Sequence, residues 1–369
     1  VRDNATLVEA TFSGGISETG GARSLIINGP AGGGTAWGGT SGIVHLSGAS
    51  SYTGGTTLAA GNLRFGHKDA IGTGTLTISG ASTVSASTAL TGSNAVLNAI
   101  TQSNALTFAG ANSLELGGAI NLGGAARTIT TNSDTGASLI LSGAISGFAT
   151  ADGTAFTLAG NATGSGTIRG GFLMTGDAAD MALTGGEWTH ETGTSRVADD
   201  LTTSGANAVL NLNSGLFQVR DDFSVTANST LNLNGTGALS FSTPTLSADA
   251  SLRSFGGGTI VIGANNAVVV TDFDGLRIGT DGSGTGNLVM NANQTVSEFV
   301  LGNRNIDRTG NVTGTGTLTV TGNLDVYQGT IAANLASTGS TAFEKFSSNT
   351  VTLSGDNSGL ASTGVTLHY

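Results

Sequence analysis

The amino-acid sequence predicts an all-β fold, a solenoid whose short parallel strands wind in coils of roughly 20 residues. Three observations lead to this prediction. Apolar and small polar residues alternate in segments of strand length, glycines end most of these segments, and similar segments recur far along the chain. Glycine supplies 61 of the 369 residues, well above its usual share of about 7%, as expected for a chain rich in tight turns.

Alternating segments occur along nearly the whole chain, and each is typical of a short strand that ends in a tight turn. Their Leu, Ile and Val residues would form the inward side of each strand. No segment has the pattern of an amphipathic helix, so we expect almost no helix. In chain order, the expected strands lie within 42–48, 75–80, 105–110, 113–118, 138–143, 156–160, 209–215, 230–237, 259–263, 317–322 and 350–355.

Internal repetition favours a solenoid over other all-β folds. The segment 206–215 ("ANAVLNLNSG") returns at 227–237 ("ANSTLNLNGTG"), an offset of 21 residues. A propeller blade takes about 40 residues, whereas a repeat of about 20 suffices for one coil, and such coils would number about 18 in this chain. The pairs expected to stack in neighbouring coils are Leu210 on Leu231, Leu212 on Leu233, and Asn211 on Asn232.

The repeats also predict the domain organisation. We expect residues 1–40 to form a strand-rich start of the solenoid or an interaction segment, and residues 41–369 to form one continuous solenoid. Residues 169–222 hold the densest charge and are expected to form a more charged excursion from it. The chain opens at Val1 without a methionine, as a trimmed or partial chain does, so its ends need not be natural boundaries.

Charge and composition exclude several classes of protein. The chain has 24 acidic and 13 basic residues, and its net charge of −11 repels phosphate backbones, so we expect no nucleic-acid partner. The absence of cysteine rules out a disulfide framework and a thiolate metal site. No apolar run reaches the ~20 residues of a membrane helix, so we expect no membrane span in this chain.

Residues 44–80 ("VHLSGASSYTGGTTLAAGNLRFGHKDAIGTGTLTISG") resemble the passenger-associated strand repeat of bacterial autotransporters. That repeat has an alternating strand, Ser-Gly, Tyr-Thr-Gly-Gly-Thr-Thr, Gly-x-Leu and Gly-Thr-Gly. Residues 316–359 are similar to the segment that usually precedes it. The resemblance implies a right-handed parallel β-helix, secretion to the outer surface of a Gram-negative-type bacterium, and an adhesive or structural role.

The segment 185–193 ("GGEWTHETG") is the best candidate for a ligand site. Strand alternation would place Glu187 and Glu191 on one side, with Trp188 and His190 on the other. Two carboxylates on one side can serve as acid and base, or can bind a sugar beside a tryptophan. The alternative is a solvated strand with no ligand. The solvated strand is the interpretation we favour, so carbohydrate binding at Glu187, Trp188, His190 and Glu191 is stated as a hypothesis, and no catalytic residue is predicted.

No metal or cofactor is predicted. The acidic pairs Asp199/Asp200, Asp221/Asp222 and Asp272/Asp274 offer oxygen ligands of the kind calcium takes. They do not repeat with the glycine-aspartate spacing of calcium-binding β-rolls. The four histidines lie far apart in the sequence and show no metal-ligand spacing, so we interpret them as structural.

These observations favour a non-catalytic extracellular scaffold, either a surface adhesin, a matrix protein or a filament-forming protein. The alternative is a β-helix enzyme that acts on or binds polysaccharide, with charged residues of 169–222 converging in a groove. Solenoid ends expose unpaired strand edges, so we expect them to be covered by further repeats of a longer chain or by a second copy stacked end to end. The residues expected to take part are Ala5, Leu7, Val8, Val365 and Leu367.

Overall fold

The computed structural model describes residues 9–28, 42–176, 178–241, 250–269, 275–305, 307–338, 341–360 and 365–368. It is an all-β parallel solenoid, which confirms the predicted fold class. The solenoid has about 13 turns spaced about 23 residues apart, a spacing close to the predicted coil of roughly 20 residues, although the turns are fewer than the roughly 18 expected. In the described part of the chain the helical structure is a single 3-10 turn, η1 (Gly92–Asn94).

The chain divides into two compact units. Unit 1 comprises Val1–Gly176 and Gly185–Trp188, and unit 2 comprises Asp177–Thr184 and Thr189–Tyr369. The predicted boundary at residue 40 falls in 29–41, outside the described residues. The described part of the chain contains no helix that is long and apolar enough to cross a membrane.

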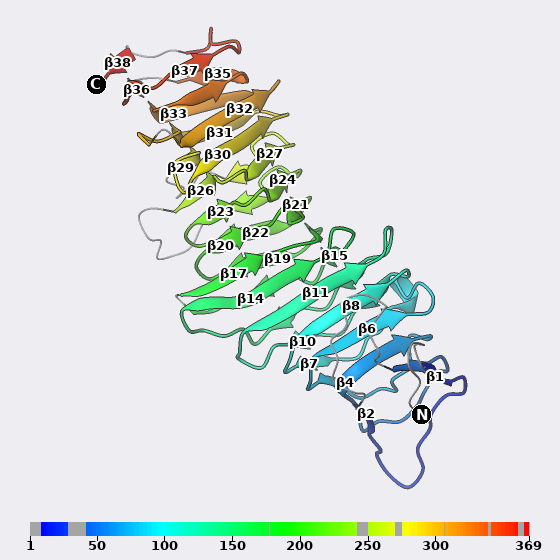
Figure 1. The fold of residues 1–369 in the computed structure, drawn as a ribbon. Coiled ribbons are helices and arrows are strands. Elements are labelled where there is room, and N and C mark those ends of the chain that lie inside the picture. The colour runs from blue at the N-terminus through cyan, green and yellow to red at the C-terminus, as the bar shows by residue number, and fades with distance from the viewer. Residues whose placement is uncertain are drawn as a thin grey trace. The chain divides into compact units, whose positions relative to one another are not determined.

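Unit 1 contains three sets of parallel strands, and successive strands of a set lie side by side in Figure 1. The first set is β1 (Glu9–Phe12), β3 (Ile43–Leu46), β4 (Thr56–Phe65), β6 (Ser82–Ala86), β8 (Leu106–Gly110), β11 (Arg127–Ser133) and β14 (Gly153–Gly160). The second is β2 (Leu25–Asn28), the start of β4, β5 (Leu76–Ile78), β7 (Ile100–Gln102), β10 (Ile120–Asn121), β13 (Ile145–Ser146) and β16 (Phe172–Leu173). The third is β9 (Leu114–Leu116), β12 (Leu139–Leu141) and β15 (Ser165–Ile168).

Unit 2 is built in the same way. Its first set is β17 (Ala179–Leu183), β20 (Leu201–Thr203), β23 (Phe223–Val225), β26 (Ser251–Ser254), β29 (Gly275–Ile278), β31 (Gln294–Leu301), β33 (Thr317–Val326), β36 (Ala342–Lys345) and β38 (Val365–Leu367). The second is β19 (Thr194–Val197), β22 (Leu216–Val219), β25 (Leu239–Ser240) and β28 (Val268–Val269), and β35 (Asn334–Ser337) pairs with the start of β33. The third is β21 (Val209–Leu212), β24 (Thr230–Leu233), β27 (Thr259–Ile262), β30 (Gly284–Met290), β32 (Arg308–Gly314), β34 (Gly329–Ile331) and β37 (Val351–Leu353). The remaining strand, β18 (Glu187–His190), has its first two residues in unit 1 and its last two in unit 2.

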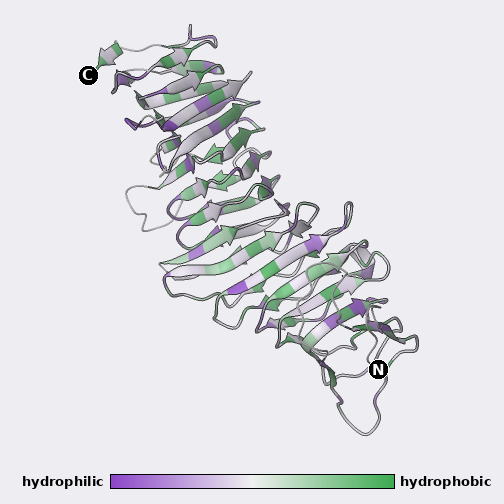
Figure 2. Ribbon diagram, in the orientation of Figure 1, coloured by the Kyte–Doolittle hydropathy of each residue, from purple (hydrophilic) through white to green (hydrophobic). Residues whose placement is uncertain are grey.

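Stacked leucines form the core of unit 2 as the repeat predicts. Leu210 lies beside Leu231 in the register of β21 and β24, and Leu231 lies beside Ile260 of β27. All three side chains are buried, and Figure 2 shows hydrophobic residues recurring on successive strands. The pair of Leu212 and Leu233 stacks in the same way. These rungs are confirmed, and each buries apolar surface only because the next turn covers it.

An amide ladder accompanies the leucine rungs. Asn232 Nδ2 donates a hydrogen bond to Asn211 Oδ1 over 2.7 Å, across the predicted offset of 21 residues. Two residues further on, Asn234 Nδ2 donates to Asn213 Oδ1 over 2.8 Å. The predicted stacking of Asn211 on Asn232 is therefore confirmed, and the ladder satisfies polar groups that alternate with the leucines.

The segment with the repeat resemblance forms a closely packed corner of unit 1. The Tyr52 ring is 1% exposed, and its hydroxyl lies 2.6 Å from Thr56 Oγ1. Gly72 has a φ of +65°, and a Cβ there would lie 2.2 Å from the carbonyl oxygen of Tyr52. Packing therefore explains the tyrosine of this motif, and backbone conformation together with close packing explains the glycine.

Candidate functional site

The four residues predicted to bind carbohydrate lie in β18 and at the position directly after it, and they alternate between exterior and interior. In unit 1, Glu187 is exposed, whereas Trp188 is 0% exposed and its Nε1 donates to the carbonyl oxygen of Ala159 over 3.3 Å. The Trp188 ring packs on Gly166, where an added Cβ would lie 2.4 Å from the ring. The tryptophan is therefore a core residue, and its ring is not available to stack on an external sugar.

His190 is also an interior residue, within unit 2. Its Nδ1 lies 3.1 Å from the Ser214 carbonyl oxygen, and its ring meets the Phe217 ring edge-on with centroids 5.4 Å apart. Burial lowers the pKa of His190 below its usual range, which favours the neutral ring with Nδ1 as donor. Glu191 is partly exposed. Within each unit the alternation is as predicted: Glu187 is exposed and Trp188 is buried in unit 1, and Glu191 is partly exposed and His190 is buried in unit 2.

Several aspartates meet at a corner of unit 2. Ligand oxygens of Asp199, Asp200 and Asp221 lie within 4.8 Å of one another. Partial burial raises the pKa of Asp200 to about 6, and the nearby carboxylates act in the same direction. Asp200 Oδ1 accepts a hydrogen bond from the Asp222 amide over 3.0 Å. Asp200 thus binds the backbone of the next turn. Asp272 and Asp274 lie outside the described residues.

Of the five residues predicted to take part in self-association, the structure describes two. Ala5, Leu7 and Val8 lie outside the described residues. Val365 and Leu367 lie in β38 and are 61% and 55% exposed. Strand β38 pairs in parallel with β36, so both apolar residues stand at the edge of that sheet.

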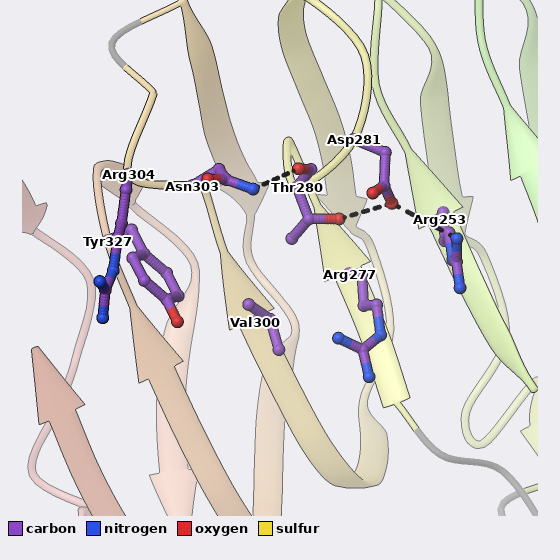
Figure 3. A pocket seen from close by; sticks show the side chains of 9 residues that line it. Arg253, Arg277, Thr280, Asp281, Val300, Asn303, Arg304 and Tyr327 are labelled. Atoms are coloured by element: carbon purple, nitrogen blue, oxygen red, sulfur yellow. Dashed lines mark hydrogen bonds and ion pairs between the residues drawn. The ribbon is translucent and has the colours of Figure 1, made fainter. Parts of the chain in front are cut away.

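A groove of about 260 Å³ on unit 2 was not anticipated from the sequence. Three arginines contribute to its wall, Arg253 from β26, Arg277 from β29 and Arg304 from the turn after β31 (Figure 3). Arg253 and Arg277 are direct neighbours in the strand register, and Val300 follows Arg277 in the next turn. The outer surface of the first strand set thus forms one side of the groove.

Ion pairs hold two of the arginines in place. Arg253 Nη2 lies 2.7 Å from Asp222 Oδ2, and its Nε donates to Ser251 Oγ over 2.6 Å. Arg277 Nη2 lies 3.5 Å from Glu298 Oε1. Arg304 is exposed and forms no ion pair with a carboxylate of the described chain. It is therefore the cation of the groove that is most accessible to an added anion.

Turns at the corner supply the polar groups of the groove. Gly279 has a φ of +73°, which starts the turn that presents Thr280 and Asp281. Thr280 Oγ1 donates to Asp281 Oδ2 over 3.0 Å, and Asn303 Nδ2 donates to the Thr280 carbonyl oxygen over 2.8 Å (Figure 3). The two turns are thus tied to each other, which fixes the shape of the groove.

An aromatic stack begins at the groove and continues through the following turns. The Tyr327 and Phe346 rings are stacked with centroids 5.3 Å apart, and the Phe346 and His368 rings with centroids 4.6 Å apart. Burial raises the pKa of the Tyr327 phenol, and the nearby Asp325 carboxylate adds to the effect. Tyr327 therefore keeps its hydroxyl proton at neutral pH and can donate a hydrogen bond.

One signal in the sequence pointed to this groove. The segments "SLRS" at 251–254 and "GLRI" at 275–278 carry arginine at equivalent positions, and these arginines become neighbours when the turns stack. The contribution of Arg304 had no such signal, because it lies in a corner turn.

The chain matches no family model, and no curated protein or solved structure aligns with it significantly.

Proposed function

We propose that this chain is the solenoid of a non-catalytic extracellular scaffold, namely a surface adhesin, a matrix protein or a filament-forming protein. The observation that carries the proposal is the apolar composition of the interior. In each unit the inward positions of successive turns are occupied by Leu, Ile, Val and Phe, so the interior contributes stability and the outer faces are left for contacts with other molecules. The resemblance of residues 44–80 to autotransporter repeats supports secretion to the outer bacterial surface.

End-to-end association is part of this proposal. An exposed strand edge that carries apolar side chains favours pairing with a further strand, and β38 has such side chains at Val365 and Leu367. The added strand would come from further repeats of a longer chain or from a second copy. In the second case, residues Ala5, Leu7 and Val8 are the expected partners.

The location of the protein in the cells that produce it tests the scaffold proposal. Antibodies against the chain should label intact cells or their surrounding matrix, and protease added from outside should remove the label. A label that appears only after the cells are lysed would refute an extracellular role. Light scattering over a dilution series tests the association: a monomer at every concentration would remove the end-to-end contact and leave the scaffold itself in place.

A polysaccharide-acting enzyme is the second candidate, because carboxylates of the charged segment converge at Asp199, Asp200 and Asp221. A carboxyl group with a pKa of about 6, such as Asp200, is suited to proton transfer. Reducing-end assays on neutral and acidic polysaccharides test this candidate, and we expect no release of sugar. Activity that disappears in Asp200→Asn would favour the enzyme over the scaffold.

A further inference from the structure

We propose that the arginine groove of unit 2 binds an acidic saccharide, a sugar chain that carries carboxylate or sulfate groups. Arg253, Arg277 and Arg304 face a single depression of about 260 Å³, together with the Tyr327 side chain (Figure 3). This inference does not depend on the scaffold function, because it concerns one surface of unit 2 wherever the protein resides. It also differs from the carbohydrate hypothesis for Glu187 and Glu191, since it involves other residues and an anionic ligand.

The charge of the groove is the first argument. The chain has a net charge of −11, yet three of its 13 basic residues contribute to this one groove. Asp281 is the acidic residue among those that line it. Its carboxylate lies 3.7 Å from Arg253 Nη1, so three guanidinium groups share the groove with a single acidic side chain. A concave surface on which one sign of charge predominates concentrates ligands of the opposite sign, and here the surrounding acidic protein would turn anions away from most other surfaces.

One of the three arginines is available to bind an anion, and the other two are held in a fixed orientation by ion pairs. Arg304 has no carboxylate partner among the described residues, so an anion can bind its guanidinium without breaking an ion pair. Asp222 and Glu298 hold Arg253 and Arg277 at neighbouring register positions. Arginine binds carboxylate and sulfate oxygens through two parallel hydrogen bonds, and a side chain that is already oriented loses less entropy when it does so.

The remaining residues of the groove favour a sugar chain over a small anion. The wall extends over the successive strands β26, β29 and β31, and adjacent strands are about 4.8 Å apart, so the groove is longer than a single anionic group. Asn303, Asp281 and the Tyr327 hydroxyl add the donors and acceptors that sugar hydroxyls require. Val300, between Arg277 and Tyr327 in Figure 3, is 6% exposed and contributes a small apolar part of the wall.

Direct binding to the complete 369-residue chain tests this proposal. The probes are fluorescently labelled oligomers of alginate, which carry carboxylates, labelled heparin oligosaccharides, which carry mainly sulfates, and labelled dextran, which is neutral. We expect the unaltered protein to bind at least one acidic probe, with an affinity that falls as salt is raised, and not to bind dextran. Binding of alginate but not of heparin would assign the ligand to the carboxylate class, and the reverse result would assign it to the sulfate class.

Two matched variants separate a built site from general charge. Arg304→Gln removes the accessible guanidinium and should weaken binding about tenfold, as loss of one charge-assisted hydrogen-bonded pair predicts. Arg308→Gln makes the same charge change in β32, outside the groove, and should change affinity by less than about twofold. Arg304→Lys keeps the charge without the planar fork and should give an intermediate affinity. Circular dichroism spectra would establish that each variant is folded.

The proposal is overturned if neither acidic probe binds, or if dextran binds as well as they do. It is also overturned if Arg304→Gln and Arg308→Gln weaken binding equally, because the ligand would then respond to net charge. Failure of this test would leave the extracellular scaffold proposal intact, and failure of the localisation test would leave the groove intact.

Discussion

Replacement of Leu231 by aspartate tests the stacked core directly. Leu231 is 0% exposed between Leu210 and Ile260 of the neighbouring turns. Loss of the buried leucine removes about 2 kcal/mol of transfer free energy, and a carboxyl group left there without a partner costs about 2 kcal/mol more. We therefore expect Leu231→Asp to lower the free energy of unfolding by about 4 kcal/mol.

The neighbouring residue provides a matched control. Asn232 is partly exposed, and its Nδ2 donates to Asn211 Oδ1 over 2.7 Å. Asn232→Asp replaces that donor by an acceptor and should cost about 1 kcal/mol, the usual net value of one hydrogen bond. Both variants introduce the same charge one residue apart, so the difference between them isolates the inward position.

Urea denaturation followed by far-UV circular dichroism measures the effect at neutral pH. The transition of Leu231→Asp should move to a clearly lower urea concentration than that of Asn232→Asp, with slopes compared to detect partial unfolding. Equal midpoints for the two variants would refute the assignment of Leu231 to an inward rung.

Three further outcomes are expected. The folded protein keeps the Asp200 proton up to about pH 6, whereas an unfolded aspartate loses it near 3.8. In this pH window the folded protein therefore binds more protons than the unfolded chain, so the free energy of unfolding should fall as the pH rises from 4 to 6. Because Asp200 is partly exposed to solvent, its share of this fall is roughly 1–2 kcal/mol. Denaturation measured over this pH range should show that Asp200→Asn removes that share. Gly166→Ala should lower the melting temperature, because its Cβ would lie 2.4 Å from the Trp188 ring. The double variant Glu187→Gln/Glu191→Gln should keep the circular dichroism spectrum, and neither it nor the unaltered protein should release reducing ends from polysaccharide.

The sequence was sufficient to predict features that repeat. Leu210 and Leu231 could be paired because similar segments recur at one offset, and a parallel solenoid places residues at that offset side by side. The length of a turn was predicted closely, but the number of turns was overestimated, because the best-matched pair of segments, 206–215 and 227–237, has an offset of only 21 residues. The next turn, from Leu231 to Ile260, contains more residues, and local alternation does not reveal this difference.

The sequence indicates only part of the groove: Arg253 and Arg277 stand at equivalent positions of similar segments, whereas the other side of the groove depends on residues that do not repeat. Arg304 comes from a corner turn, and its place beside Tyr327 depends on how the turns after β31 and β33 fold. The tryptophan illustrates the opposite problem. Alternation correctly placed Trp188 opposite Glu187, but the pattern alone does not tell which side of a strand faces the interior when both sides carry polar residues.

The pairing of each strand with its counterpart one turn away also determines how such a chain can fold. Partners are separated by about 23 residues, so the entropy lost on closing a turn is small and similar at every step within a unit. Once one pair of turns has formed, each further turn can add to its open edge without waiting for distant parts of the chain. The same locality makes whole turns interchangeable in principle: removal of the 21 residues from Val209 to Ser229 would bring Thr230 into the place of Val209 and preserve the alternation of the strand. Variation by loss or gain of complete turns is therefore the change in length that this architecture tolerates best.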